Sequence, residues 1–139
     1  MKKRICVSIL LTMFILTSAS SLKCLAQSEN GSLITGTWRR IIAPEEKYTA
    51  SATVVFSEDG TLWGSSEYQG IDLSMTLNGT YKFLADNVVQ INYLLTKQYG
   101  SGKTEKEQVT LIWLITELKE NEMTVEFFPE RKLKYTYRK

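Results

Sequence analysis

Residues 72–83 read DLSMTLNGTYKF, and this stretch decides the fold class. Its odd-numbered positions are apolar or aromatic, with Gly79 as the exception, and its even-numbered positions are polar. Successive side chains of a β-strand point to opposite faces, so a period of two predicts a strand with one buried face and one wet face. A helical period does not fit these positions.

The same alternation recurs along most of the chain. Asp59-Gly60, between two such stretches, suits a tight hairpin because glycine accepts a positive φ. The stretches that we expect to form strands are 36–43, 48–57, 61–69, 72–84, 87–97, 106–117, 122–128 and 132–138. Short strands at regular spacing, with no convincing helix, predict an all-β sandwich or barrel. Because closure removes exposed edges, we expect a single eight-stranded antiparallel up-and-down barrel.

Residues 1–26 have the features of a secretory signal peptide. Basic residues fill positions 2–4, and a mostly apolar run of signal-peptide length follows over 5–16. Ala26 supplies the small residue that precedes a cleavage site. We expect cleavage after Ala26 or, alternatively, within 18–21, and therefore an exported protein that is periplasmic or secreted.

Two alternatives stay open for this segment. Left uncleaved, it would be a membrane anchor, although its apolar run is shorter than the ~18 residues that a spanning helix needs. Lipid attachment at Cys24 is the other alternative, although Lys23 stands where a small residue is usual. The expected organisation beyond the signal peptide is a flexible leader over 27–35 and one folded domain over 36–139, with no membrane span.

Loss of residues 1–26 changes the charge and the chemistry of the chain. It removes four of the 17 basic residues and none of the 15 acidic ones, which leaves a net charge of −2. A mildly acidic domain without a basic cluster is a poor nucleic-acid binder, since phosphates reward concentrated Lys and Arg. Both cysteines, Cys6 and Cys24, are also lost, and the chain has no histidine. Thiol and histidine nucleophiles are therefore excluded, and we expect no metal site and no cofactor.

Two weaker features of the sequence are compatible with catalysis. Gly102-Lys103-Thr104 is similar to part of a phosphate-binding loop, but Lys97 stands where the first glycine is required. The carboxylates that a hydrolase could pair are Glu67, Asp72, Glu105 and Glu126. Their placement favours solvated charges on strand faces and loops, so we expect that the protein is not an enzyme.

Five short motifs occur in a fixed order along the chain. Gly36-Thr37-Trp38 opens the first expected strand, FSEDGTL follows at 56–62, and NGTY follows at 78–81. LITEL at 114–118 and MTV at 123–125 then form a late hairpin. Together these motifs resemble the small bacterial lipocalin-like domains, which are calycin-type β-barrels, and the resemblance covers nearly all of the chain beyond the signal peptide.

The resemblance implies a barrel closed at the Trp38 end, where an arginine packs over the tryptophan ring. The meander brings the eighth expected strand back to that end, so we expect Arg138 over Trp38, with Arg131 as a weaker candidate. A cation over an aromatic ring adds modest stabilisation. The alternative is that Trp38 is an ordinary core residue and Arg138 a frayed terminus.

An eight-stranded barrel is just wide enough to be filled by side chains or to hold one small ligand. The inward-facing side chains expected near the open end, which would touch a ligand, are Tyr48, Ala50, Tyr68, Leu73, Met75, Tyr93, Leu95, Val109, Phe127 and Leu133. Small residues, namely Ala50, Ala52, Gly64 and Ser66, leave space beside the large ones. The alternative is that these side chains only fill the barrel. The polar loop expected over 97–107 is a gating lid or an idle hairpin end.

These observations favour an exported binding protein that buries a small apolar or amphipathic molecule in the barrel. The alternative function is a non-enzymatic interaction or inhibitor module whose open-end loops grip a protein or the cell envelope, with no partner protein identified. A cavity of roughly a few hundred Å³ would favour the first function. A filled barrel with an exposed apolar loop patch would favour the second.

Overall fold

The computed structural model describes residues 31–128 and 133–139. Its strands are β1 (Gly36–Arg40), β2 (Thr49–Phe56), β3 (Thr61–Tyr68), β4 (Leu73–Ala85), β5 (Val88–Tyr99), β6 (Thr104–Leu118), β7 (Glu122–Phe128) and β8 (Lys134–Arg138). The expected signal peptide, positions 27–30 of the expected leader, and Arg131 lie outside the described residues. Within the described ranges, no helix has both the length and the apolar character that crossing a membrane requires.

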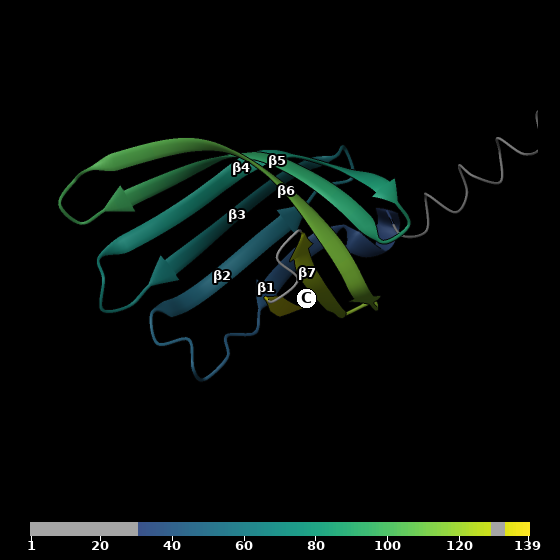
Figure 1. Cartoon of the computed structure of the whole chain (residues 1–139), viewed down its shortest axis with the longest axis horizontal. Helices are drawn as coiled ribbons and strands as arrows, with labels where there is room; N and C mark the ends of the chain where they lie inside the picture. The colour runs from purple at the N-terminus through teal and green to yellow at the C-terminus, as the bar shows by residue number, and fades with distance from the viewer. Residues whose placement is uncertain (1–30, 129–132) are drawn as a thin grey trace, which may run out of the picture.

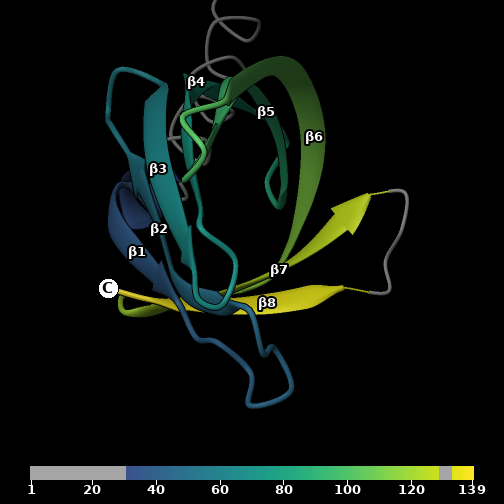
Figure 2. The same cartoon turned by 90° about the vertical axis from the view of Figure 1, so that its left-hand side faces the viewer.

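The strands close into one barrel with up-and-down neighbour order, which confirms the expected fold class (Figure 1). Each strand pairs antiparallel with the next, and β8 pairs with β1 to complete the ring. This closing seam is short, with Arg39 opposite Arg138 and Arg40 opposite Tyr137. The β1–β2, β3–β4 and β5–β6 connections lie together at one end, the open end, which faces the viewer in Figure 2.

The β5–β6 hairpin is longer, and its turn tighter, than the sequence suggested. Instead of a loop over 97–107, β5 runs to Tyr99 and β6 begins at Thr104. Lys97 Nζ lies 3.5 Å from Glu107 Oε2 across the two strands. Opposite charges on neighbouring strands support a ladder, so a polar stretch formed strand where we expected loop. A short turn therefore stands where we expected a long loop.

A helical turn over 31–34 closes the other end of the barrel. Ile34 and Trp38 are both fully buried, and the Trp38 Nε1–H donates to the Ile34 carbonyl oxygen at 2.7 Å. The turn lies within the segment expected to be a flexible leader, and the structure differs from that expectation here. Ile34 is a large apolar side chain in a mostly polar segment, and its burial removes apolar surface from water.

Lys139, and not Arg138, packs over Trp38. Lys139 Nζ lies 4.8 Å from the centre of the Trp38 ring, whereas Arg138 Nε lies 3.3 Å from Glu122 Oε2. Side chains alternate along β8, so the residue after the buried Tyr137 points outward and the next one points inward again. The Arg138 prediction is therefore wrong by one position, while Trp38 is a core residue.

Two glycines permit close approaches that a side chain would block. Gly36 has φ +121°, and a Cβ there would lie 3.2 Å from Lys139 Cε, so the first motif of the chain leaves room for the lysine that covers Trp38. A Cβ on Gly79 of β4 would lie 2.0 Å from the Asn92 carbonyl oxygen of β5. Gly79 therefore lets these two strands approach closely where it breaks the apolar row of β4.

Candidate functional site

The inward-facing side chains divide the barrel interior into two halves. Toward the helical turn lies the closed half, whose inward side chains are buried: Trp38, Val54, Phe56, Leu62, Val89, Ile91, Trp113, Ile115, Met123, Val125 and Tyr137. Toward the open end lies the open half, whose inward side chains are only half-buried: Tyr68, Met75, Tyr93, Leu95, Val109, Leu111, Phe127 and Tyr135. β4 is the exception, because its inward side chains are half-buried along the whole strand. The open half thus leaves apolar interior surface in contact with solvent.

Seven of the ten side chains expected to touch a ligand are half-buried and follow the inward phase of their strands. They are Tyr68, Leu73, Met75, Tyr93, Leu95, Val109 and Phe127. The Tyr68 hydroxyl lies 3.8 Å from the Met75 sulfur, so two of them also contact each other. The structure therefore brings these seven to the inner face of five strands at the open half.

The other three expected side chains lie elsewhere. Tyr48 and Leu133 fall outside the strand bounds and are 60% and 50% exposed, so they belong to the rim of the open end. Ala50 is exposed at an irregularity in the β2–β3 register between Thr49 and Ser51. The extra residue of a bulge shifts the alternation, which explains why the phase counted from Val54 fails at Ala50.

A pocket of about 90 Å³ lies inside the barrel where the two halves meet. The residues that line it are Arg40, Ala52, Thr53, Val54, Leu62, Ser66, Leu77, Ile91, Tyr93, Trp113 and Tyr137. Ala52 lies opposite Ser66 in the β2–β3 ladder, and these two small residues leave room beside Arg40. Gly64, also expected to leave space, is covered instead, because a Cβ there would lie 3.0 Å from Leu77 Cγ. The pocket is smaller than a cavity for a whole ligand and fits only part of one.

Among the residues that line this pocket, only Tyr93 was expected to touch a ligand, and the charged Arg40 is the most consequential of those that sequence reasoning missed. Its Nη2 lies 2.5 Å from Glu46 Oε2, and its guanidinium carbon lies 4.3 Å from the centre of the Tyr135 ring. Glu46 belongs to the β1–β2 connection, and its carboxylate also accepts a bond from the Thr49 hydroxyl at 3.4 Å. A usable signal was present, since Arg40 follows Trp38 by two positions and so shares its inward phase.

Two N–H groups of the pocket are buried without an acceptor. Across residues 31–128 and 133–139, Arg40 Nε and Trp113 Nε1 are the buried side-chain nitrogens that make no hydrogen bond. Trp113 packs its ring against Tyr137 and Phe127, with centroid distances of 5.7 Å to each. The tryptophan is therefore fixed by ring contacts, while its polar edge is unsatisfied within the described chain.

The two pocket tyrosines are held in their neutral form. Burial raises the pKa of Tyr137 far above its ordinary value, although the nearby Arg40 charge opposes this. Burial also raises the pKa of Tyr93, and the Glu107 carboxylate adds to the effect. Both hydroxyls therefore stay protonated at neutral pH, and each can donate or accept a hydrogen bond.

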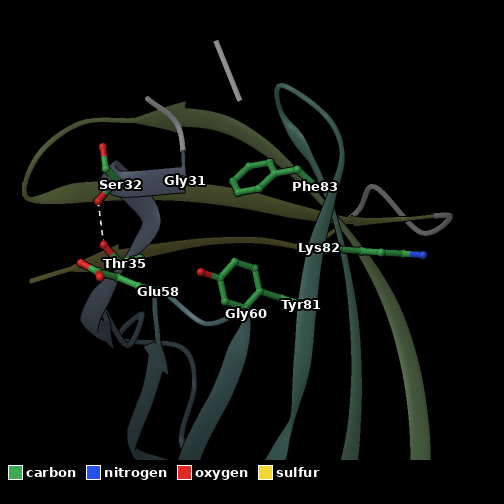
Figure 3. Close-up of a pocket in the computed structure, with 8 residues that line it drawn as sticks. All are labelled: Gly31, Ser32, Thr35, Glu58, Gly60, Tyr81, Lys82 and Phe83. Carbon is green, nitrogen blue, oxygen red and sulfur yellow. Dashed lines mark hydrogen bonds between the residues drawn. The ribbon is translucent and has the colours of Figure 1, made fainter. Parts of the chain in front are cut away.

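A second, larger hollow of about 380 Å³ lies at the closed end, between β4 and the helical turn (Figure 3). Phe83 and Tyr81 point into it from β4, whereas Lys82 points away. The Tyr81 hydroxyl already donates to the Ser57 carbonyl oxygen at 2.8 Å. One wall is Gly31, the first described residue, so we assign no ligand to this groove.

None of the four carboxylates considered for catalysis is fully buried. Glu67 and Asp72 are exposed, and Glu126 is half-buried on β7. Glu105 pairs with Lys103 at 2.6 Å, and bonds from Lys103 and Tyr99 lower its pKa, which is opposite to what a general acid needs. Within the part of the chain that the structure describes, no group of three or more His, Cys, Asp or Glu residues is placed to hold a metal ion.

The architecture is compatible with a calycin-like fold, namely an eight-stranded antiparallel closed barrel with up-and-down neighbour order. Its inner surface combines half-buried apolar side chains with a small, mostly apolar pocket that Arg40, Ser66 and Tyr93 also line. Comparisons with known protein-family models, with curated proteins and with solved structures find no match.

Proposed function

We propose that this chain is an exported, non-catalytic, lipocalin-like binding protein that holds a small apolar or amphipathic molecule in the open half of the barrel. One observation supports the proposal most directly: the inward side chains change from buried to half-buried partway along every strand except β4. Covering apolar surface is worth about 25 cal/mol per Å². A ligand that packs against the open half would gain this free energy without rearranging the closed half.

The interior pocket favours an amphipathic ligand over a purely apolar one. Arg40, Ser66 and Tyr93, which carry polar groups, line it, while Leu95 and Val109 continue the apolar lining toward the open end. A few placed polar groups within an apolar site are the usual means of orienting a small ligand. The pocket would take the polar end of the molecule, and the open half would cover its apolar remainder.

The proposal is tested with two neighbouring leucines of β5. Leu95 is half-buried and faces inward, whereas Leu94 is 39% exposed and faces outward. We would titrate the wild type, Leu95→Asn and Leu94→Asn with N-phenyl-1-naphthylamine, a neutral dye whose fluorescence rises in apolar sites. We expect the wild type to bind the dye, Leu95→Asn to bind it about tenfold more weakly, and Leu94→Asn to bind it as the wild type does. A tenfold loss of affinity corresponds to about 1.4 kcal/mol of binding free energy.

Thermal unfolding of both variants checks that they fold. No dye binding by the folded wild type would refute the proposal, and so would equal losses in the two variants, since the dye would then sit on the outer surface. Native mass spectrometry of the exported protein adds a second measurement, in which a co-purified small molecule is expected.

Export is the part of the proposal that rests on residues 1–26. Expression with these residues in a bacterial host, followed by cell fractionation and N-terminal sequencing, is expected to yield a protein outside the cytoplasm that begins at Gln27. Cytoplasmic protein that retains residues 1–26 would contradict export. Lipid attached at Cys24 would replace free export with anchoring.

A second candidate function is favoured by the rim of the open end. Exposed apolar side chains come from the connections there, namely Ile41 at 42%, Tyr48 at 60%, Ile71 at 45% and Leu133 at 50% exposure. Such a rim suits a protein-interaction module at the cell envelope. Photo-crosslinking residues at positions 48 and 71 would capture one defined partner in cells, whereas the same residue at the outward-facing Trp63 would not. Equal capture from all three positions would contradict this function.

A further inference from the structure

Two residues that line the pocket each carry a buried hydrogen-bond donor that the described protein does not use. Arg40 Nε–H and Trp113 Nε1–H are buried, both residues line the same pocket, and neither group has an acceptor in residues 31–128 or 133–139. Leaving a buried donor unsatisfied destabilises the folded state, and buried polar groups in native proteins nearly always have a partner. Two such donors in one pocket therefore indicate a position for an acceptor.

The rest of each side chain is held in place, so the donors are preorganised. Glu46 binds the outer part of the Arg40 guanidinium through Nη2, and Tyr135 covers its face. Tyr137 stacks on the Trp113 ring with an interplanar angle of 27°. Arg40 also lies opposite Tyr137 across the β1–β8 seam, which ties the two donors to a common neighbour.

The size of the pocket restricts the acceptor to a small group. A pocket of about 90 Å³ is well below the volume of a site for a whole drug-sized ligand, so it accommodates only a head group of a few heavy atoms. The walls made by Leu62, Leu77 and Ile91 are apolar, which suits an ester, ketone, amide or similar unit attached to a hydrocarbon chain.

Charge decides between a neutral and an anionic head group. The positive charge of Arg40 is already matched by Glu46 at 2.5 Å, and their side chains are only 13% and 24% exposed. A carboxylate added to this pair would leave one uncompensated negative charge in a largely buried site, which is costly. A neutral acceptor would satisfy the two N–H groups without disturbing the ion pair.

We propose that Arg40 Nε–H and Trp113 Nε1–H together bind the neutral carbonyl or similar acceptor of an amphipathic ligand, which enters the barrel head first. This inference rests on the proposed function, because it specifies the chemical class of the molecule held in the open half. The ion pair between Arg40 and Glu46 acts as a positioning contact, and the ligand accepts from the two remaining donors.

The test compares two probes that share a hydrocarbon chain and differ in charge. Methyl decanoate and decanoate are titrated at pH 8 by displacement of N-phenyl-1-naphthylamine from the wild type, Arg40→Lys and Trp113→Phe. Lysine keeps the positive charge for Glu46 but lacks the Nε–H, and phenylalanine keeps an aromatic ring but lacks the indole N–H. We expect the wild type to bind the ester about tenfold more tightly than the acid, and each variant to lose about tenfold for the ester, as one hydrogen bond to a buried donor predicts.

A spectroscopic measurement on the unaltered protein removes any dependence on the folding of variants. The chain has three tryptophans, and each gives one indole N–H signal in an NMR spectrum. Trp38 already donates to Ile34, and Trp63 is 45% exposed on the outer face. Addition of methyl decanoate is expected to shift the Trp113 signal alone toward the position of a hydrogen-bonded indole, with Trp38 as the bonded reference and Trp63 as the exposed one.

The outcomes separate this inference from the proposed function. If the dye does not bind the wild type, the proposed function fails and the inference fails with it. If the dye binds but ester and acid compete equally, with both variants and the Trp113 signal unchanged, the pocket holds water only and the head-group inference is overturned. Preference for the acid, lost in Arg40→Lys, would overturn the neutral-acceptor class in favour of an anion.

Discussion

The closed and open halves of the barrel are built from the same strands with the same alternation, yet one is a core and the other is a surface. In the closed half, the centre of the Phe56 ring lies 4.9 Å from that of Tyr81 and 5.8 Å from that of Trp113, and Ile34 is fully buried at the end of the barrel. In the open half, Ala52 and Ser66 leave room, and the inward side chains stay half-buried. Alternation therefore sets which face is inward, whereas side-chain size and the helical turn set whether that interior is filled.

The comparison implies that the closed half supplies most of the stability and that the open half is available for binding. Stability of an eight-stranded barrel without disulfides must come from burial of apolar surface, and the fully buried side chains lie in the closed half. The open half contributes less to stability because water still reaches it, so its residues are available for binding. Substitutions in the two halves should therefore affect different measurements.

The largest expected effect is that of Trp38→Ala. This substitution removes a fully buried indole and its hydrogen bond to Ile34, and it should lower the free energy of unfolding by ~3–5 kcal/mol. Leu95→Ala in the open half should cost about 1 kcal/mol, since its side chain is only half-buried and the cost of truncation scales with burial. Urea unfolding followed by circular dichroism measures both values.

Equal costs for the two variants would break the comparison between the halves. A loss below about 1 kcal/mol for Trp38→Ala would remove it from the core altogether. Dye binding gives the opposite ranking if the comparison holds, because Leu95→Ala should weaken binding more than Trp38→Ala does in protein that remains folded.

The fold could be predicted from the sequence because apolar and polar residues alternate along most of its strands. The strand over 72–83 and the Asp59-Gly60 turn follow from period and turn chemistry, and the position of Trp38 in the closed end follows from the resemblance. Errors arose where a local feature overrides the period. The irregularity beside Ala50 shifts the phase, and charge pairing extends the strands into the expected loop 97–107.

The site was less predictable than the fold because it depends on which side chains meet across the barrel. Arg40 was assigned to a strand but given no role, since a charged residue in a small barrel is usually taken as surface. Only the closed ring places it beside Trp113, which lies more than 70 positions further along the chain. The Arg138 prediction failed for a simpler reason, because the resemblance implied an arginine, whereas the alternation along β8 places Lys139 over Trp38.

Gly79 tests the boundary between the halves. It lies opposite the buried Leu62 on one side and the half-buried Tyr93 on the other. Gly79→Ala would place a Cβ 2.0 Å from the Asn92 carbonyl oxygen, so the β4–β5 pair must separate, at an expected cost of about 2 kcal/mol. Chemical unfolding measures the cost. An unchanged stability would show that β4 and β5 can separate at Gly79 without cost, so that packing between the two halves is not tight there.

Alkaline pH should affect the closed half first. The pKa of Tyr137 is raised in the folded protein, whereas in the unfolded chain tyrosine titrates near its ordinary value of 10.0. The unfolded state therefore loses its proton first, so stability is intact below pH 10 and falls as the pH rises above it, by about 1 kcal/mol at pH 11. Tyr137→Phe should flatten this loss, and Tyr93→Phe, half-buried in the open half, should flatten it less.

Unfolding free energies at pH 8 and pH 11 measure the difference. A larger effect of Tyr93→Phe than of Tyr137→Phe would reverse the ranking of the two halves. Identical pH dependence in the wild type and Tyr137→Phe would mean that Tyr137 is solvated in the folded protein.

The smallest expected effect distinguishes the two cations at the end of β8. Lys139→Met keeps the aliphatic stem but removes the charge over Trp38, and it should lower the free energy of unfolding by about 0.5 kcal/mol, as for an exposed cation–π contact. Arg138→Met removes only an exposed ion pair with Glu122 and should change stability by about 0.3 kcal/mol or less. Urea unfolding of each variant, alone and combined with Trp38→Phe, resolves the order of the two stability effects. Coupling to Trp38→Phe is expected for Lys139→Met alone. If Arg138 showed that coupling instead, the register of β8 against β1 would differ by one residue, and the inward placement of Tyr137 beside the pocket would fail with it.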